Sequence, residues 1–223
     1  MSIFDHIISL AAPYECLGCE RQGSLLCVAC GHRLPKMNER CYSCRKPTFS
    51  AATCLACRST SNLERVHVAT VYEDIAKDLV WKLKFDGAQA AAGIMAANMK
   101  FLLKNGRSAR EIVLVPVPTA TSRVRQRGYD QADLLARALS RELGLPRLKC
   151  LARLGQTHQI GAGRRQRLQQ LTSAFVVKKS VFDTHIVLVD DVVTTGATLE
   201  AAAQVLKNAG AQHISALVFA SPL

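Results

Sequence analysis

Eight cysteines in the first 57 residues form four C-x-x-C pairs, a spacing that suits metal coordination. Two thiolates separated by two residues can bind one metal ion from a single turn, whose backbone N–H groups hydrogen-bond to the sulfurs. Two such pairs complete a tetrahedral zinc site with four cysteine ligands, so the sequence predicts two structural zinc ions. The predicted ligands are Cys16, Cys19, Cys27, Cys30, Cys41, Cys44, Cys54 and Cys57.

Disulfides and a redox dithiol are the competing interpretations of these cysteines. Disulfides require an oxidising compartment, but Asp5 and His6 stand where an export signal would be apolar. A redox site uses one C-x-x-C pair, not four in succession. The pairs can combine sequentially, with spacers of seven and nine residues, or interleaved, with spacers of 21 and 23. Compact hairpins and Gly31 directly after Cys30 favour sequential pairing. Because few apolar residues lie between the pairs, metal would supply much of this module's folding free energy.

A second constellation follows the apolar run 187–189, where Asp190 and Asp191 precede a segment rich in threonine. That segment consists of Thr194, Thr195, Gly196, Ala197 and Thr198. Backbone N–H groups, hydroxyls and a helix N-terminus would converge there on one phosphate, and Gly196 would allow a close backbone approach. The acid pair suits hydroxyls or a divalent cation beside that phosphate, and a ribose 5-phosphate offers both ends. Neither G-x-x-x-x-G-K-[ST] nor G-x-G-x-x-G occurs, which disfavours P-loop NTPases and dinucleotide-dependent dehydrogenases.

Alternating strands and helices would position these loops. From about residue 66 we expect helices over 74–87, beginning at Asp74 as cap, and over 88–104, 130–143 and 197–209, with strands over 112–115, 148–152, 175–177, 186–189 and 214–219. Strands that are apolar throughout and alternate with helices predict an α/β fold with a parallel sheet covered on both faces. Ligands of such sheets bind at the carboxyl ends of the strands. We therefore expect a double zinc-ribbon module over residues 1–65 and an α/β domain over 66–223.

Composition agrees with a soluble protein that carries an uneven positive charge. The 223 residues are 49% hydrophobic with a net charge of +12, and no apolar stretch approaches the length of a membrane span. With no export signal, we expect a cytoplasmic protein. Residues 121–179 contain 13 Lys and Arg against three acids. This segment would attract a polyanion, either nucleic acid or a polyphosphate metabolite, and the alternative is a solvated basic surface.

Several motifs resemble known families. Residues 187–199, VLVDDVVTTGATL, resemble the phosphoribosyl-pyrophosphate (PRPP) signature of type I phosphoribosyltransferases. The C-x-x-C ribbons, WKLKFDG at 81–87, VPVP at 115–118, RQRGYDQA at 125–132 and the THQ to AF stretch at 157–175 resemble the ComF/GntX family. The resemblance covers nearly the whole chain. Tyr129 and Asp130 stand where many members have Phe and Asn, and the sequence assigns neither a role.

The resemblance implies a role for each part of the site. Asp190 and Asp191 would be the catalytic pair that holds the ribose hydroxyls, and residues 194–198 would bind the 5-phosphate. The turn that starts at Thr119 would be the pyrophosphate loop, with Arg123 and Arg127 as partners. Residues 154–172 would close over the site. Mg²⁺ bound with PRPP, the arginines and backbone N–H groups would stabilise the leaving pyrophosphate, so no protein nucleophile is needed.

Two functions follow from the resemblance. The first is a PRPP-binding factor in natural transformation that handles single-stranded DNA in the cytoplasm, with DNA-uptake or helicase components as partners. Aromatic residues for stacking on bases are sparse in the basic segment, so backbone electrostatics would dominate DNA binding. The second is an active phosphoribosyltransferase that transfers ribose 5-phosphate to an unidentified acceptor in nucleotide or related metabolism. A zinc-ribbon scaffold with a vestigial site is a third hypothesis.

Overall fold

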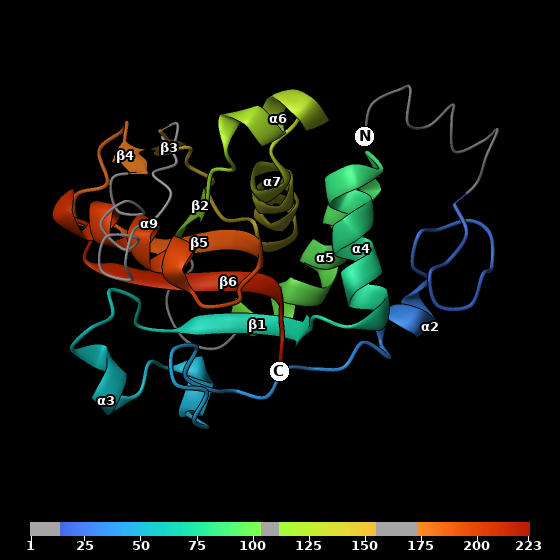
Figure 1. Cartoon of the computed structure of the whole chain (residues 1–223), viewed down its shortest axis with the longest axis horizontal. Helices are drawn as coiled ribbons and strands as arrows, with labels where there is room; N and C mark the ends of the chain where they lie inside the picture. Colours follow the sequence, from blue (N-terminus) through green and yellow to red (C-terminus); the bar gives the residue numbers. More distant parts are fainter. Residues whose placement is uncertain (1–13, 104–111, 155–173) are drawn as a thin grey trace, which may run out of the picture.

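The computed structural model describes residues 14–103, 112–154 and 174–223, and its centre is a four-stranded parallel sheet (Figure 1). The strand order is β1-β6-β5-β2, with bounds β1 Val66–Val71, β2 Ile112–Pro116, β5 His185–Val192 and β6 His213–Ser221. The central strands β5 and β6 are mostly buried, as strands covered on both faces must be. The predicted α/β fold with a parallel sheet is confirmed. β1 was not predicted.

The expected helices are also present. The helices are α2 (Val28–Gly31), α3 (Leu55–Arg58), α4 (Asp74–Phe85), α5 (Ala90–Met99), α6 (Thr121–Arg127), α7 (Gln131–Leu143) and α9 (Ala197–Asn208), with short 3-10 helices at Phe49–Ala51 and Lys100–Leu103. α5 ends earlier than predicted, because its last part continues as the second 3-10 helix. The predicted cap of α4 was wrong by one position, since Glu73 occupies the cap and Asp74 begins the helix. α6 lies where only a turn was expected.

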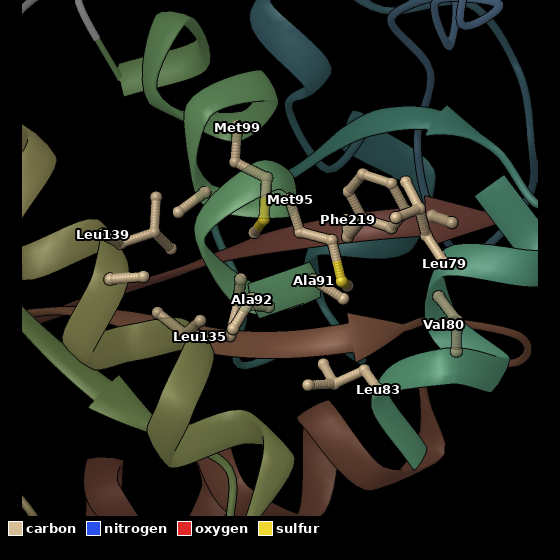
Figure 2. Close-up of a cluster of buried hydrophobic side chains, with 14 of the residues drawn as sticks. Leu79, Val80, Leu83, Ala91, Ala92, Met95, Met99, Leu135, Leu139 and Phe219 are labelled. Atoms are coloured by element: carbon tan, nitrogen blue, oxygen red, sulfur yellow. The ribbon is translucent and has the colours of Figure 1, made fainter. Parts of the chain in front are cut away.

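Side chains of alternating strand residues divide the core between the two faces of the sheet. Val187 and Val189 pack on one face with α4, α5 and α7, whereas Ile186 and Leu188 pack on the other with α9. Figure 2 shows the first face, where Phe219 of β6 lies beside Leu79 of α4 and Met95 of α5, and Leu135 and Leu139 of α7 complete the cluster. Both faces are therefore covered by helices, and in such folds ligands bind at the carboxyl ends of the strands.

The two short predicted strands lie outside the main sheet. β3 (Leu151–Arg153) and β4 (Phe175–Val177) pair antiparallel with each other, and Phe175 joins the core on the α9 face. A three-residue strand carries too little pattern for its partner to be predicted from sequence. This small ribbon stands beside the carboxyl end of β2 and brackets the undescribed residues 155–173 (Figure 1).

The N-terminal cysteine-rich segment packs on both faces of the sheet. Cys16, Leu26 and Cys30 belong to the core on the α4 face, whereas Tyr42 and Leu63 belong to the core on the α9 face. The segment therefore buries its apolar side chains against the α/β domain and not in a core of its own. Its boundary at residue 65 stays a prediction. Within the described ranges, no helix has the length and apolar character needed to cross a membrane.

Candidate functional site

The eight cysteines form two clusters, and the sequence neighbours combine. Cys16, Cys19, Cys27 and Cys30 form the first cluster, and Cys41, Cys44, Cys54 and Cys57 form the second. Within each cluster the sulfur atoms all lie within 4.8 Å of one another. This grouping confirms the sequential pairing that the spacers favoured. Helices α2 and α3 each begin directly after the third cysteine of a cluster, which turns the fourth cysteine back toward the others.

The electrostatics of both clusters fit a divalent cation. The backbone N–H of Cys27 donates to Cys16 Sγ at 3.3 Å and lowers the pKa of that thiol to about 6. An Arg33 hydrogen bond lowers the pKa of Cys30, but burial and the neighbouring sulfurs outweigh it and raise the pKa to about 11. Four sulfurs this close cannot all ionise without a positive charge between them, and a metal ion supplies that charge. The two clusters of four cysteines could therefore hold zinc ions.

The second cluster also contains one thiol with a lowered pKa and one with a raised pKa. Burial raises the pKa of Cys41, but backbone N–H groups of Cys44, Cys54 and Ser43 outweigh it and bring the pKa down to about 6. Cys57 shows the opposite shift: although a Ser43 hydrogen bond lowers its pKa, the adjacent sulfurs and burial raise it to about 12. Each cluster thus contains one thiol with a lowered pKa and one with a raised pKa. A bound metal ion would favour the thiolate form of both.

The acid pair lies at the carboxyl end of β5. Asp190 is half-buried, whereas Asp191 is only 3% exposed, and the Asp191 backbone N–H donates to Asp190 Oδ1 at 2.8 Å. Burial and the adjacent Asp191 carboxylate raise the pKa of Asp190 well above its usual range. Asp191 Oδ2 is buried, and Lys84 Nζ lies 2.5 Å from it as its ion-pair partner. A buried carboxylate oxygen of this kind suits a cation or a hydroxyl.

The threonine-rich loop joins the acid pair to α9. Gly196 caps the helix with a φ of +77°, while Thr194 and Thr195 are exposed. The Thr195 hydroxyl accepts from the Ala197 N–H at 3.4 Å. The loop thus presents exposed hydroxyls beside the N-terminus of a helix, which is a favourable place for a phosphate. The sequence had explained Gly196 by a close ligand approach, and the structure adds that a Cβ there would lie 2.7 Å from the Tyr42 ring.

A second loop lies beside the acid pair, because β2 is the parallel neighbour of β5. The Val117 N–H donates to the Val189 carbonyl at 3.0 Å, so the chain leaves β2 alongside Asp190. Asp130 then holds Thr119 by accepting from its N–H at 3.0 Å and from its hydroxyl at 3.2 Å. The same carboxylate caps α7 by accepting from the Ala132 N–H. Asp130, to which the sequence assigned no role, therefore fixes the predicted pyrophosphate loop.

The predicted arginines differ in their surroundings. Arg123 is exposed on α6, and its charge lowers the pKa of Arg153 after burial, which is the larger cause. Asp190 also acts electrostatically on Arg153, so Arg153 lies between the charges of α6 and the acid pair. Arg127 instead donates to Gln131 at 2.9 Å and lies 5.0 Å from the centre of the Phe85 ring. The structure thus brings Arg123 toward Arg153 and holds Arg127 against α4.

Sequence reasoning missed Lys84, Arg153, Tyr42 and Arg45. Lys84 lies within the WKLKFDG motif, which was used for resemblance but not for a role. Arg153 ends β3 and stacks on Phe175 at 5.4 Å, a contact that depends on the small ribbon and leaves no local pattern. The predicted closing segment 154–172, with Arg164, Arg165 and Arg167, lies outside the described residues apart from Leu154.

Tyr42 and Arg45 connect the second cysteine cluster to the threonine-rich loop. Arg45 Nη2 donates to the Thr194 carbonyl at 2.6 Å. The Tyr42 hydroxyl donates to Glu200 in the first turn of α9 and also pairs with Ser61 at 2.7 Å. The two loops at the strand ends are therefore supported from different sides, the first by the cysteine-rich segment and the second by α7.

Comparison with known proteins agrees with this geometry. Residues 129–222 match the family of the phosphoribosyl transferase domain. This range contains the acid pair, the threonine-rich loop and Asp130. It begins after the cysteine-rich segment, α4 and α6, so Lys84, Tyr42 and Arg45 lie outside the match.

Relatives of similar length share nearly the whole chain. The DNA utilization protein YhgH of Salmonella typhimurium is 31% identical over 213 residues, covering 89% of this chain and 85% of that protein. Competence protein F of Haemophilus influenzae is 29% identical over 210 residues, covering 89% and 86%. Competence protein ComFC of Bacillus subtilis is 28% identical over 193 residues, covering 83% and 79%. The similarity thus extends well beyond the residues that match the phosphoribosyl transferase domain.

Proposed function

Because this chain belongs to the ComF family, we propose that it binds PRPP at the carboxyl ends of β2 and β5 and acts in the handling of single-stranded DNA during natural transformation. The observation that carries the PRPP proposal is the arrangement of the acid pair. Asp190 and Asp191 stand directly before the loop that caps α9, and beside the loop that Asp130 holds. At the carboxyl ends of the strands, the acid pair, which suits hydroxyls, thus stands between two loops that each suit a phosphate.

Each group would receive one part of the ligand. Residues 194–198 would bind the 5-phosphate through exposed hydroxyls and helix N–H groups. Asp190 and Asp191 would accept hydrogen bonds from the ribose hydroxyls, displacing Lys84 from Asp191. Thr119, Arg123 and the newly found Arg153 would face the pyrophosphate. Mg²⁺ bound with PRPP would neutralise charge on the leaving group. The positive charges of Arg123 and Arg153 would stabilise the negative charge that develops on the departing oxygen, so the reaction would need no protein nucleophile.

Calorimetric titration of PRPP with Mg²⁺ tests this site. We expect binding by the wild type and none by Asp190→Asn/Asp191→Asn, because the isosteric amides keep the shape and remove the charge. Asp78→Asn, which removes an exposed charge on α4, is the matched control and should bind normally. Absence of binding by the wild type would reject the site. A screen for pyrophosphate release over nucleobases then decides whether the protein transfers the ribose 5-phosphate, which is the alternative function.

We propose that each cysteine cluster holds one structural zinc ion. The donor set is four thiols in both cases, and the mixture of lowered and raised pKa values favours a bound cation. Elemental analysis should give two zinc ions per wild-type chain. The Cys16→Ser/Cys19→Ser and Cys41→Ser/Cys44→Ser variants should each hold one. Loss of both ions from either variant would show that the two sites do not fill independently.

An exposed aromatic pair supports the DNA part of the proposal. Trp81 and Phe85 of α4 are 50% and 62% exposed, and their ring centres lie 5.6 Å apart. Arg127 stacks on Phe85, and Arg123 and Arg125 lie on the same helix, α6, as Arg127. Rings beside arginines are the combination that binds unpaired bases and their phosphates. The sequence had suggested that stacking side chains were sparse in the basic segment, and the fold brings two of them to it from outside.

Fluorescence reports on this surface directly, because Trp81 is the single tryptophan. Single-stranded DNA should quench its emission. The Trp81→Ala/Phe85→Ala variant lacks this fluorophore, so its binding is followed by the anisotropy of fluorescently labelled DNA. It should bind more weakly at every salt concentration with little change in the salt dependence, whereas Arg127→Ala should reduce the slope of log K against log salt by about one. Phe49→Ala, which removes a 92% exposed ring elsewhere, is the control. Equal effects of the Trp81/Phe85 and Phe49 variants would reject this surface.

A further inference from the structure

The turn between the first two ligands of the second cluster has a defined shape. The Arg45 N–H donates to the Cys41 carbonyl at 2.8 Å, and the Cys41 N–H donates to the Lys46 carbonyl at 2.9 Å. Arg45 has a φ of +65°, which is unusual for a residue with a side chain. Because both Cys41 and Cys44 lie inside this turn, a metal ion bound to them would hold the direction in which Tyr42 and Arg45 project.

Arg45 bridges the threonine-rich loop and the end of the last strand. Its Nη2 donates to the Thr194 carbonyl at 2.6 Å, and its Nη1 donates to Ser221 Oγ at 3.1 Å. The loop is thereby fixed at its first residue. The guanidinium also places a positive charge beside residues whose exposed hydroxyls would face an anion.

Tyr42 supports the middle of the loop and the helix behind it. Its ring occupies the space next to Gly196, where a Cβ would be only 2.7 Å away. Its hydroxyl reaches Glu200, which also accepts from the Asn62 N–H at 3.0 Å and from Asn62 Nδ2 at 3.1 Å. Glu200 is thus turned toward the cysteine-rich segment, and its negative charge is satisfied there.

The first cluster contacts the opposite face of the sheet. Cys16 and Cys30 belong to the core around α4, α5 and α7, and Gly18 packs directly against Cys30 and Ile75. Arg33 donates to Cys30 at 2.8 Å, so this cluster also has an arginine next to it. The two clusters therefore provide a matched pair within one chain, each with four cysteines and one arginine, but only the second contacts the loop through residues that the structure describes.

We propose that the second cysteine cluster is a positioning element for the threonine-rich loop, acting through Tyr42 and Arg45, so that binding of a 5-phosphate depends on metal at this cluster and not on metal at the first. The part concerning the 5-phosphate rests on the proposed PRPP function. The part concerning the loop does not, because it follows from contacts present without a ligand.

Separate titrations with ribose 5-phosphate and with pyrophosphate locate the effect. Arg45→Ala should weaken ribose 5-phosphate and PRPP about tenfold, the usual cost of losing one charge-assisted hydrogen bond, and should leave pyrophosphate unchanged. Arg45→Lys should restore part of the loss. Arg33→Ala should change none of the three affinities. Equal losses for Arg45→Ala and Arg33→Ala, or an equal loss for pyrophosphate, would overturn the proposal.

Hydrogen exchange tests the same coupling without any ligand. Two amides report on the loop: that of Val193, bonded to the Ala220 carbonyl, and that of Glu200, bonded to the Gly196 carbonyl. Cys41→Ser/Cys44→Ser should speed exchange in residues 193–200, whereas Cys16→Ser/Cys19→Ser should not. If the first of these variants does not fold, Arg45→Ala gives the reading on a folded protein. Unchanged exchange in Arg45→Ala rejects the coupling. If PRPP does not bind the wild type but exchange responds as expected, the proposed function fails and the positioning role stands.

Discussion

Lys84 Nζ lies 2.5 Å from Asp191 Oδ2 and joins helix α4 to the end of strand β5. The Asp191 side chain is almost fully buried, whereas that of Lys84 is 21% exposed. The lysine therefore neutralises a carboxylate that has lost its water, beside a second carboxylate that burial already disfavours. Tyr129 fixes the same end of α4, because its hydroxyl donates to the Leu83 carbonyl at 2.5 Å. Helix α4 thus holds the acid pair in place, although the sequence analysis used its WKLKFDG motif only as evidence of a family resemblance.

Replacement of Lys84 should destabilise the fold. Lys84→Met keeps the length and apolar part of the side chain but leaves Asp191 without its cation, so we expect a loss of about 1 to 3 kcal/mol in the free energy of unfolding. Lys82→Met is the matched control, because Lys82 lies on the same helix and pairs with Asp86 at the surface. Its loss should be below about 0.5 kcal/mol. Urea unfolding measures both, and equal losses would contradict the importance of the Lys84 pair.

Asp190→Asn should instead stabilise the protein, increasingly as the pH rises. Burial and Asp191 raise the pKa of Asp190 in the folded state, with Lys84 acting in the opposite direction. The folded protein therefore binds this proton more tightly than the unfolded chain, and the associated stability is present below the usual aspartate pKa and is lost as the pH rises through the raised value. Asparagine has no such loss. Melting temperatures of the variant and the wild type should agree at low pH and diverge toward neutral pH, and a constant difference across this range would contradict the prediction.

Gly196→Ala should be more harmful than a similar change at Gly210. Both glycines have a positive φ, +77° and +95°, and an added Cβ would lie 2.7 Å from an aromatic ring in each case. At Gly210 the ring is that of Phe182, which is 79% exposed and can move, so about 1 kcal/mol is expected. At Gly196 the ring is that of buried Tyr42, so about 2 to 3 kcal/mol is expected. Only Gly196→Ala should also weaken ribose 5-phosphate, as measured by calorimetry.

Asp130 should tolerate asparagine but not alanine. Asp130→Ala removes the cap of α7 and both hydrogen bonds to Thr119, so we expect a loss of about 1 kcal/mol in stability and weaker binding of pyrophosphate. Asp130→Asn keeps one carbonyl oxygen as an acceptor and is also a good cap, so its effect should be small. Thermal unfolding and pyrophosphate titration give the two readouts. A pyrophosphate affinity that ignores the alanine substitution would show that Thr119 does not need this anchor.

Local signals account for what the sequence predicted correctly. The strand, loop and helix around residues 186–209 follow one another directly, so apolar runs, Gly196 and the helical period were sufficient. The cysteine grouping was favoured by the compact hairpins of sequential pairing and by Gly31 after Cys30. Helix α6 was missed because its sequence, TSRVRQR, has no apolar face, and none of its residues is buried. β1 was missed because His67 and Thr70 interrupt its apolar pattern, although both are buried.

Contacts between distant residues explain the rest. Arg45 and Thr194 are 149 positions apart, and nothing in C-x-x-C spacing indicates which strand end the cluster will face. Tyr42 lay between two predicted ligands, and an aromatic ring inside a metal-binding turn was a signal that could have been followed. Lys84 was visible in its motif, but its partner depends on the order of the strands. Pairing of β3 with β4 depends equally on the tertiary fold.

The cysteine-rich segment forms hydrogen bonds with the end of the last strand, and these bonds constrain the order in which parts of the fold can form during synthesis. Arg40 donates to the Pro222 carbonyl at 2.7 Å, a contact across 182 positions, and Arg45 reaches Ser221. The second cluster leaves the ribosome early, but Tyr42 and Arg45 have no surface to pack on until β6 and α9 have been translated. Such long-range closure is slow to form. A nascent chain can therefore carry the complete second cluster well before the loop that this cluster supports exists.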